Sequence, residues 1–448
     1  MKNNSYLFSK KLWHSRFISA LTISSLLFVV SGCDSTIRNN RTGAVTDTIP
    51  HNQPTINHQA LPIEVKALTS IPEGIAEVVT ANNQFAIDMY QQINGKSEQV
   101  DENVFFSPYS LSTAMAMLYA AAEGETKAQI QKTFHYPSMD VLNPNSAALY
   151  NQFNKLNPDY KLATANDLWM QQGLRPNQNY LDTVQHYYSG QVTALDFEGS
   201  PDPARQTINK KIADKTKQLI PELLPKGSIK SDTAVVLTNA VYFKGDWTLP
   251  FMAERTSAQP FYNAIGRTST VQMMEQQSYF DYYEDKHIQV VQLPYKGDDL
   301  SMLVVLPKFN HKLAMQQLAK SLNATKIKQW RSGLVRQEVD LQLPKFKLDA
   351  RYQMKTLLAD MGMPKAFNNG AEFNLYADGP PIKLDEVYHQ AVVTVDEKGT
   401  EAAAATAIVG MYTGMSYPAE FKADHPFMFM IKDNKTGAIL FLGQVNKP

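Results

Sequence analysis

Residues 391–407 read AVVTVDEKGTEAAAATA, and this stretch decides the interpretation of the fold. Its first five residues are mostly β-branched, which is typical of a strand. The part from residue 396 to 407 is rich in Ala and Glu, which are strong helix formers. Because a helix of under about 12 residues is marginal without tertiary support, this composition alone does not establish a helix. A short surface helix after the strand therefore stays open as one interpretation.

Four other stretches of the sequence are also informative about the fold. They read NVFFSPYS at residues 103–110, TNAVYFKGDW at 238–247, FKADHPFMF at 421–429 and FLGQV at 441–445. Together with residues 396–407, they resemble the serpin family nearly residue for residue, over a span from about residue 75 to the C-terminus. One departure is Lys211, at a position where many members carry an aromatic residue. The local packing around Lys211 is therefore open to question.

The hydrophobic patterns predict an α+β fold. Apolar residues at helical spacing predict helices over residues 75–90 and 108–119, with Gly124 near the end of the second. A further helix is predicted near residues 352–361. Runs of β-branched and aromatic residues predict strands at 235–237, 241–243, 302–306 and 339–343. Helices dominate before about residue 230 and strands afterwards, which favours mainly antiparallel sheets. The resemblance implies the serpin fold, with helices packed around such sheets and an exposed reactive-centre loop.

The composition and the motifs exclude several functional classes. The 448 residues are 44% hydrophobic and 19% charged, as in a well-packed globular protein. Lys+Arg and Asp+Glu balance at 43 each, so no electrostatic case for nucleic acid exists. The sequence contains no G-x-S-x-G, H-E-x-x-H, Walker or G-x-G-x-x-G motif, and its nine His lack metal-ligand spacing. We therefore expect neither an enzyme, nor a metal, nor a cofactor.

The N-terminal 33 residues have the pattern of a targeting segment. A cationic start precedes an apolar run over residues 17–30, which is too short for the roughly 20 residues of a membrane-spanning helix. The run ends in VSGC, which resembles a bacterial lipobox whose cysteine, Cys33, is acylated and becomes the mature N-terminus. The alternative is an ordinary secretory signal with an incidental cysteine. Because Cys33 is the single cysteine, a disulfide within the chain is impossible.

These features predict three parts of the chain: a lipoprotein-type signal peptide at residues 1–33, a polar tether at 34–72 and a serpin domain at 73–448. The lipobox implies an exported protein, lipid-anchored to a bacterial membrane on the periplasmic side or at the cell surface. Asp34 resembles an inner-membrane retention signal whose meaning depends on the source organism. The membrane leaflet therefore stays open.

The resemblance implies a single-use inhibitor of proteases. In serpins a protease cleaves the exposed loop, forms an acyl-enzyme and is trapped when the loop inserts as a new strand of the main sheet. The family's hinge corresponds to Glu397, Lys398, Gly399, Thr400, Glu401, Ala402, Ala403, Ala404, Ala405 and Thr406. On this pattern Thr400, Ala402, Ala404 and Thr406 turn toward the core, whereas Glu401, Ala403 and Ala405 turn outward. Small side chains favour rapid insertion, and Gly399 supplies backbone freedom at the pivot.

Two counts place the cleaved bond differently. Counting from Gly399 gives Thr413–Gly414, and counting back from Pro426 gives Met415–Ser416. Met411 and Tyr412 are further candidates, because an apolar specificity pocket accepts them. No Arg or Lys lies between Lys398 and Lys422, which disfavours a trypsin-like target. We expect chymotrypsin-, elastase- or subtilisin-like serine proteases as partners, with papain-like cysteine proteases as a second class.

Five further positions carry over from the family without a catalytic role: Ser107, Ser110, Asn239, Trp247 and His389. Ser107, Ser110, Asn239 and His389 match the polar cluster over which the main-sheet strands part, and Trp247 matches the aromatic near the point of first insertion. His389 and Trp247 also fit ordinary core packing. The chain is expected to be a monomer that binds no nucleic acid. The competing interpretations are a non-inhibitory serpin acting as a binding module and, with less support, a lipid-anchored hydrolase.

Overall fold

A computed structural model describes residues 71–96, 102–154, 157, 159–173, 175–378, 382–399 and 417–448. The chain divides into a unit of residues 1–62, which lies outside these ranges, and a unit of residues 63–448. The predicted signal segment, Cys33 and nearly all of the tether therefore lie outside the described residues. Residues 400–406 of the hinge and every candidate for the cleaved bond, at 411–416, lie outside them as well.

The first sheet has five strands in the order β10-β11-β4-β2-β3. In that order they span Phe346–Gln353, Glu386–Val395, Val235–Gly245, Tyr160–Gln171 and Gln191–Leu195. Nearly every residue of β4 and β11 is buried, which fits strands covered on both faces. These two strands pair directly and in parallel, from Glu386 opposite Val236 to Val392 opposite Tyr242. Their pairing stops before their C-terminal ends, which lie at the same edge of the sheet.

The second sheet runs β1-β14-β13-β8-β7-β6-β9-β12, with β5 paired to β6. In that order its strands span Val104–Phe106, Ile439–Val445, Phe427–Asp433, Leu300–Pro307, Ile288–Pro294, Thr268–Glu284, Val335–Pro344, Ala419–Lys422 and, for β5, Ser257–Tyr262. Most pairs in this sheet are antiparallel, as predicted. Residues 400–416 therefore connect β11 of the first sheet to β12 of the second.

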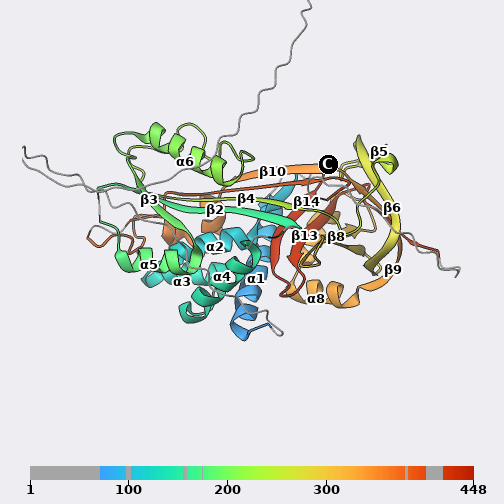
Figure 1. The fold of residues 1–448 in the computed structure, drawn as a ribbon, viewed down its shortest axis with the longest axis horizontal. Coiled ribbons are helices and arrows are strands. Elements are labelled where there is room, and N and C mark those ends of the chain that lie inside the picture. The colour runs from blue at the N-terminus through green and yellow to red at the C-terminus, as the bar shows by residue number, and fades with distance from the viewer. Residues whose placement is uncertain are drawn as a thin grey trace, which may run out of the picture. The chain divides into compact units, whose positions relative to one another are not determined.

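Helices pack around both sheets. They are α1 Glu73–Lys96, α2 Pro108–Tyr119, α3 Gly124–Phe134, α4 Met139–Asn154, α5 Gln178–Tyr188, α6 Pro201–Lys215, α7 Ala314–Ser321, α8 Ala324–Gly333 and α9 Lys355–Asp360. Figure 1 shows α6 on one side of the five-stranded sheet and α1–α5 on the other, and α7 and α8 pack against the second sheet. All twelve residues of α2 are buried, and Ser107 caps its first turn by accepting a hydrogen bond from the Ser110 N–H.

The structure corrects two predictions and refines a third. Gly124 begins α3 and does not end α2, because its φ of +51° suits the turn between the two helices. The helix predicted near residues 352–361 is α9, which begins at Lys355 because Tyr352 still pairs with His389 inside β10. The runs at 235–237 and 241–243 form one strand, because the residues between them continue the ladder. In the described ranges, no helix is both long and apolar enough to cross a membrane.

Candidate functional site

The chain turns back between β4 and β11 at the point where their pairing stops. The Asp396 N–H donates to the Gly399 carbonyl at 2.9 Å, so the chain reverses within four residues. Gly399 forms a second bridge to Asp246, just beyond β4. The Trp247 N–H donates to the Lys398 carbonyl at 2.9 Å. Gly399 is therefore the first residue that lies between the two parting strands.

A glycine is required at position 399. Its φ is +141°, which L side chains rarely adopt. A Cβ atom added there would lie 2.6 Å from Cα of Asp246 and still closer to the carbonyl oxygen of Gly245. Both contacts are to backbone, which cannot rotate away. The close approach of the turn to β4 therefore depends on the missing side chain.

We expect Gly399→Ala to lower the free energy of unfolding by about 1–3 kcal/mol, because the turn has to leave its place between the strands. Gly266→Ala is the matched control. Gly266 also has a positive φ, +81°, but an added Cβ meets nothing within 4 Å. Urea unfolding of both variants separates the cost of the φ angle from the cost of the clash. Equal losses in the two variants would contradict this explanation.

Glu397 anchors the turn with both its side chain and its backbone. Its carboxylate accepts hydrogen bonds from Lys345 Nζ and Thr256 Oγ1, each at 2.8 Å. Its carbonyl accepts the Phe251 N–H at 2.7 Å. Burial favours the neutral acid, but the hydrogen bonds from Lys345 and Thr256 outweigh it and lower the pKa of Glu397 below its ordinary value. The carboxylate is therefore held in its charged form at neutral pH.

Trp247 packs under the same turn. Its ring is 1% exposed and stacks on Tyr295, with 4.5 Å between ring centroids and 15° between the planes. Its indole N–H donates to the Asp396 carbonyl at 3.1 Å. The indole therefore satisfies its polar group while it fills the core beneath the parting strands.

A buried polar cluster lies below, where helix α2 meets the strands. The Ser107 N–H donates to His389 Nε2 at 3.1 Å, so the ring proton is on Nδ1, which faces Asn239 Oδ1. The Asn239 amide donates to Ser110 Oγ at 2.6 Å and also to Asn166 Oδ1. The structure brings together the four residues predicted from the sequence and adds Asn166. Because Asn239 lies on β4 and His389 on β11, separating these strands breaks their hydrogen bond.

We expect the native protein to lose stability below pH 6.5. Burial lowers the pKa of His389 from 6.5 to about 3. Between these values the unfolded chain binds a proton that the native state excludes, so stability rises with pH across this window and is lost on acidification. From pH 6.5 to 5 the loss amounts to about 2 kcal/mol. Urea unfolding at several pH values, with His389→Gln as the non-titrating control, measures it; equal slopes in both proteins would rule this histidine out.

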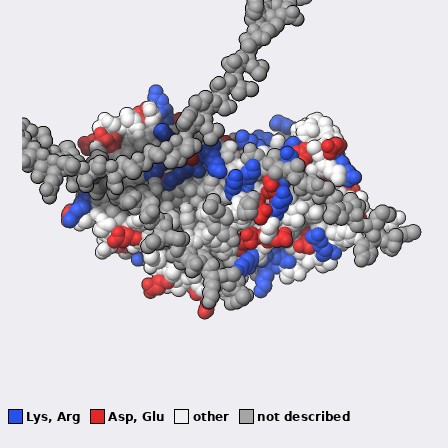
Figure 2. Space-filling model, in the orientation of Figure 1, with Lys and Arg blue, Asp and Glu red and all other residues white. Residues whose placement is uncertain are grey.

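Helix α6 is held on one face of the five-stranded sheet by an apolar layer and by an ion pair with the buried carboxylate of Asp167. The apolar layer joins α6 and the segment after it to β2, β4 and β11. Lys215 Nζ contacts both carboxylate oxygens of fully buried Asp167, at 2.8 and 2.9 Å. Lys211 Nζ lies 3.7 Å from the same carboxylate and 4.8 Å from the centre of the Trp169 ring. Lysine and arginine side chains gather beside α6 in Figure 2.

Lys211 therefore does not disturb the packing. Its ammonium group lies over the ring of Trp169 and faces the carboxylate of Asp167. The Trp169 N–H donates to Thr238 Oγ1 at 2.8 Å, which ties this contact to β4. We call α6 and the segment of residues 216–233 the α6 cover.

Comparison with known proteins identifies the family. A family model described as serpin (serine protease inhibitor) matches residues 80–448. The chain belongs to the serpin family. An uncharacterized serpin-like protein of Methanosarcina mazei is 41% identical over 378 residues, which cover 83% of this chain and 88% of the relative. A leukocyte elastase inhibitor of Xenopus laevis is 38% identical over 375 residues, which cover 82% and 99%.

The solved structures agree with the predicted serpin fold. Human thyroxine-binding globulin superposes with a TM-score of 0.76 at 29% identity, over 84% of this chain and 99% of that one. The α+β fold class predicted from the sequence is thereby confirmed. The family is one of protease inhibitors and not of enzymes. The described part of the chain holds no group of three or more His, Cys, Asp or Glu residues that suits a metal ion.

Sequence reasoning missed four polar residues of the serpin site: Asn166, Asp167, Thr256 and Lys345. Asn166 and Asp167 had a detectable signal, because they are two polar residues within an otherwise apolar stretch of β2 that is buried over residues 165–170. Thr256 and Lys345 had none, since they lie between elements and reach Glu397 only through the tertiary fold. The proposed scissile bonds lie outside the described residues.

Proposed function

We propose that this serpin is a single-use inhibitor that traps serine proteases by inserting its cleaved loop between β4 and β11. One observation carries the proposal. The two central strands pair directly and in parallel, and Gly399 already lies where their pairing stops. A strand that is antiparallel to both neighbours fits between two parallel strands and pairs with each. The sheet therefore has a place for one more strand.

In the proposed reaction the protease serine attacks the carbonyl carbon of the reactive bond. The peptide bond breaks, its nitrogen leaves as the new N-terminus of the C-terminal fragment, and the N-terminal part stays esterified to the serine. That part then inserts and carries the protease along. Trapping requires that insertion outruns hydrolysis of the ester. The α6 cover packs on Tyr242 and Val392, between which the inserting strand has to pass, so the cover has to shift during insertion.

The register supports small side chains in the hinge. Continued from the Gly399 bridges to Asp396 and Asp246, it places residue 403 between Val392 and Tyr242 on the face toward α6. Residues 400, 402, 404 and 406 then point to the opposite, buried face. By the same register, Thr406 arrives beside His389 and Asn239. It replaces the contact that these two residues lose when the strands separate.

The target class follows from the second half of the loop. Met411, Tyr412 and Met415 suit an apolar specificity pocket, and the similarity to a leukocyte elastase inhibitor points in the same direction. We propose the bond Thr413–Gly414 as the site of cleavage, with Met411, Tyr412, Met415 and Ser416 as alternatives. The proteases proposed are chymotrypsin-, elastase- and subtilisin-like enzymes, followed by papain-like cysteine proteases.

Incubation with a protease panel tests the function. An SDS-stable covalent complex is expected with at least one apolar-specific serine protease. Mass spectrometry of the released C-terminal peptide then identifies the cleaved bond. Clean cleavage across the panel without any complex would reject the inhibitor proposal. That result would leave the binding module, a role suggested by the family member solved in complex with thyroxine.

We further propose that the protein is exported and lipid-anchored through Cys33, with residues 34–72 as a tether. The support is the sequence VSGC after a short apolar run. Metabolic labelling with a palmitate analogue is expected to mark the wild type and not Cys33→Ala. Equal labelling of both proteins would refute the anchor.

A further inference from the structure

Three lysines form a row across the five-stranded sheet, on the face that carries α6 and at the end where β4 and β11 part. Lys161 on β2 lies directly opposite Lys244 on β4. Lys347 on β10 lies directly opposite Thr394 on β11. Lys244 and Thr394 are the first residues on this face beyond the last β4–β11 pair, Tyr242 with Val392. We call Lys161, Lys244 and Lys347 the lysine row.

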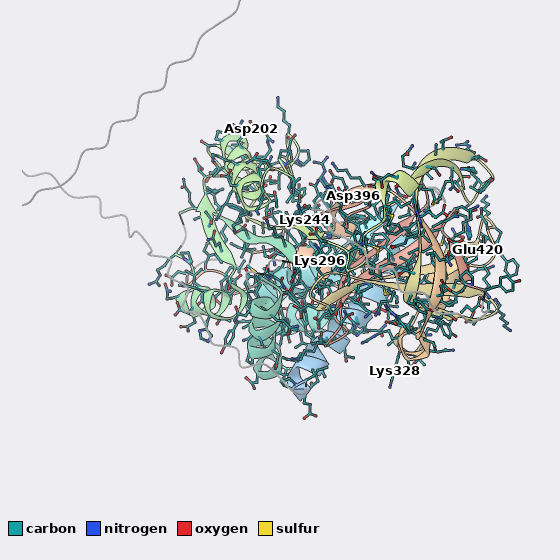
Figure 3. All side chains as sticks on the ribbon, turned by 45° about the vertical axis from the view of Figure 1, so that its right-hand side comes forward. Asp202, Lys244, Lys296, Lys328, Asp396 and Glu420 are labelled. Carbon is teal, nitrogen blue, oxygen red and sulfur yellow. The ribbon has the colours of Figure 1, made fainter. Side chains whose placement is uncertain are left out.

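The lysine row faces the solvent above the α6 cover. Side chains two residues apart on a strand share a face. Tyr242 and Val392 pack against the α6 cover, so Lys244 and Thr394 point to the same side. Lys161 and Lys347 are exposed, and Lys244 and Thr394 are partly exposed. Figure 3 places Lys244 close to Asp396, at the end of β11.

The hinge carries a single negative charge that can reach the level of the lysine row. Glu401 is the one charged residue between Gly399 and Glu420. In the inserted state proposed above, the register of the Gly399 bridges, continued by two residues, would set position 401 between Lys244 and Thr394 with its side chain on the solvent face. Lys161 and Lys347 are then the next residues outward in the same row, one on each side.

Resting on the proposed function, we propose that the lysine row receives the carboxylate of Glu401 and thereby speeds insertion of the loop. A carboxylate that enters the row lies beside Lys244 and two strands away from Lys161 and Lys347, so all three ammonium groups attract it. Glu401 is therefore a positioning residue, and its charge acts early, two residues after the turn at Gly399.

The lysine row explains both why the charge of Glu401 is tolerated during insertion and why it helps. A carboxylate on the buried face would lose its hydration, whereas the row lies in solvent and supplies three cations. Pairs at exposed positions are individually weak, so the expected effect is roughly threefold in rate. Salt at about 1 M shortens the screening length to about 3 Å and abolishes the effect.

Peptide annealing tests the inference without any protease. Synthetic peptides of residues 400–413, with Glu or Gln at position 401, are incubated with the uncleaved protein, and the increase in thermal stability reports insertion. The Glu peptide is expected to anneal roughly threefold faster than the Gln peptide at low salt. This ratio should decrease in the double variant Lys161→Gln/Lys347→Gln, which keeps Lys244, and should fall to about one at about 1 M salt. Lys328→Gln, on α8 and outside the sheet, should keep it.

A ratio of one in the wild type would overturn the inference, and so would a ratio that the double variant leaves unchanged. A protein that anneals neither peptide has no place for the loop, and this result overturns the inference as well. Failure of the proposed function is recognised separately. In that case the Glu peptide still anneals faster, but no protease forms an SDS-stable complex.

Discussion

If the proposed mechanism holds, Thr400→Arg is expected to turn the protein from an inhibitor into a substrate. In the proposed inserted state, the register continued from Gly399 puts residue 400 beside Val395 on the buried face of the sheet, in line with Val393 and Ala391. A guanidinium there has to lose its hydration without a partner, which costs several kcal/mol. A rise of about 3 kcal/mol in the insertion barrier slows this step more than a hundredfold. Hydrolysis of the acyl-enzyme then precedes insertion.

The measurement is the number of inhibitor molecules cleaved for each protease trapped. We expect this number to rise by about two orders of magnitude in Thr400→Arg, while the rate of loop cleavage stays within about twofold, since residue 400 lies far in sequence from the scissile bond. Thr400→Ser, which keeps a small hydroxyl side chain, is the matched control and should trap like the wild type. Undiminished trapping by the Arg variant would refute insertion at this register.

Site residues could be predicted from the sequence where the residue type itself reflects a need of the folded structure. Gly399 is such a case, because a backbone approach of this kind permits no side chain. The buried cluster is another, since Ser107, Asn239 and His389 are polar residues inside apolar patterns and need partners in the core. The resemblance also indicated the right architecture, because its motifs span most of the chain.

The remainder depends on contacts between segments far apart in the chain. Lys345 precedes β10, and no local pattern indicates that it meets Glu397, 52 residues later. The packing around Lys211 was open to question because the partner that explains it, Asp167, lies on strand β2, far from α6 in the sequence. Gly124 was assigned to the wrong helix end, since a glycine with positive φ serves a C-terminus and a tight turn before an N-terminus equally well.

Glu397→Lys is expected to open the upper end of the sheet. It replaces a carboxylate that joins Lys345 and Thr256 by a cation that repels Lys345. The Glu397 side chain is 15% exposed and that of Lys345 38%, so solvent screens part of the effect. The loss in unfolding free energy is about 1–3 kcal/mol. Since the turn holds Gly399 between β4 and β11, its release leaves two parting strands with unpaired backbone groups.

The unpaired backbone groups of an open sheet can pair with the loop of a second molecule. That contact is heterologous, so it does not close on itself and one molecule after another can be added. Glu397→Lys should therefore form chains of molecules on warming, detectable by size-exclusion chromatography with light scattering, at a temperature where the wild type stays monomeric. The charge-swapped double variant Glu397→Lys/Lys345→Glu restores the ion pair and should recover most of the lost stability. A Glu397→Lys protein that melts like the wild type and stays monomeric would show that this carboxylate does not hold the strands together.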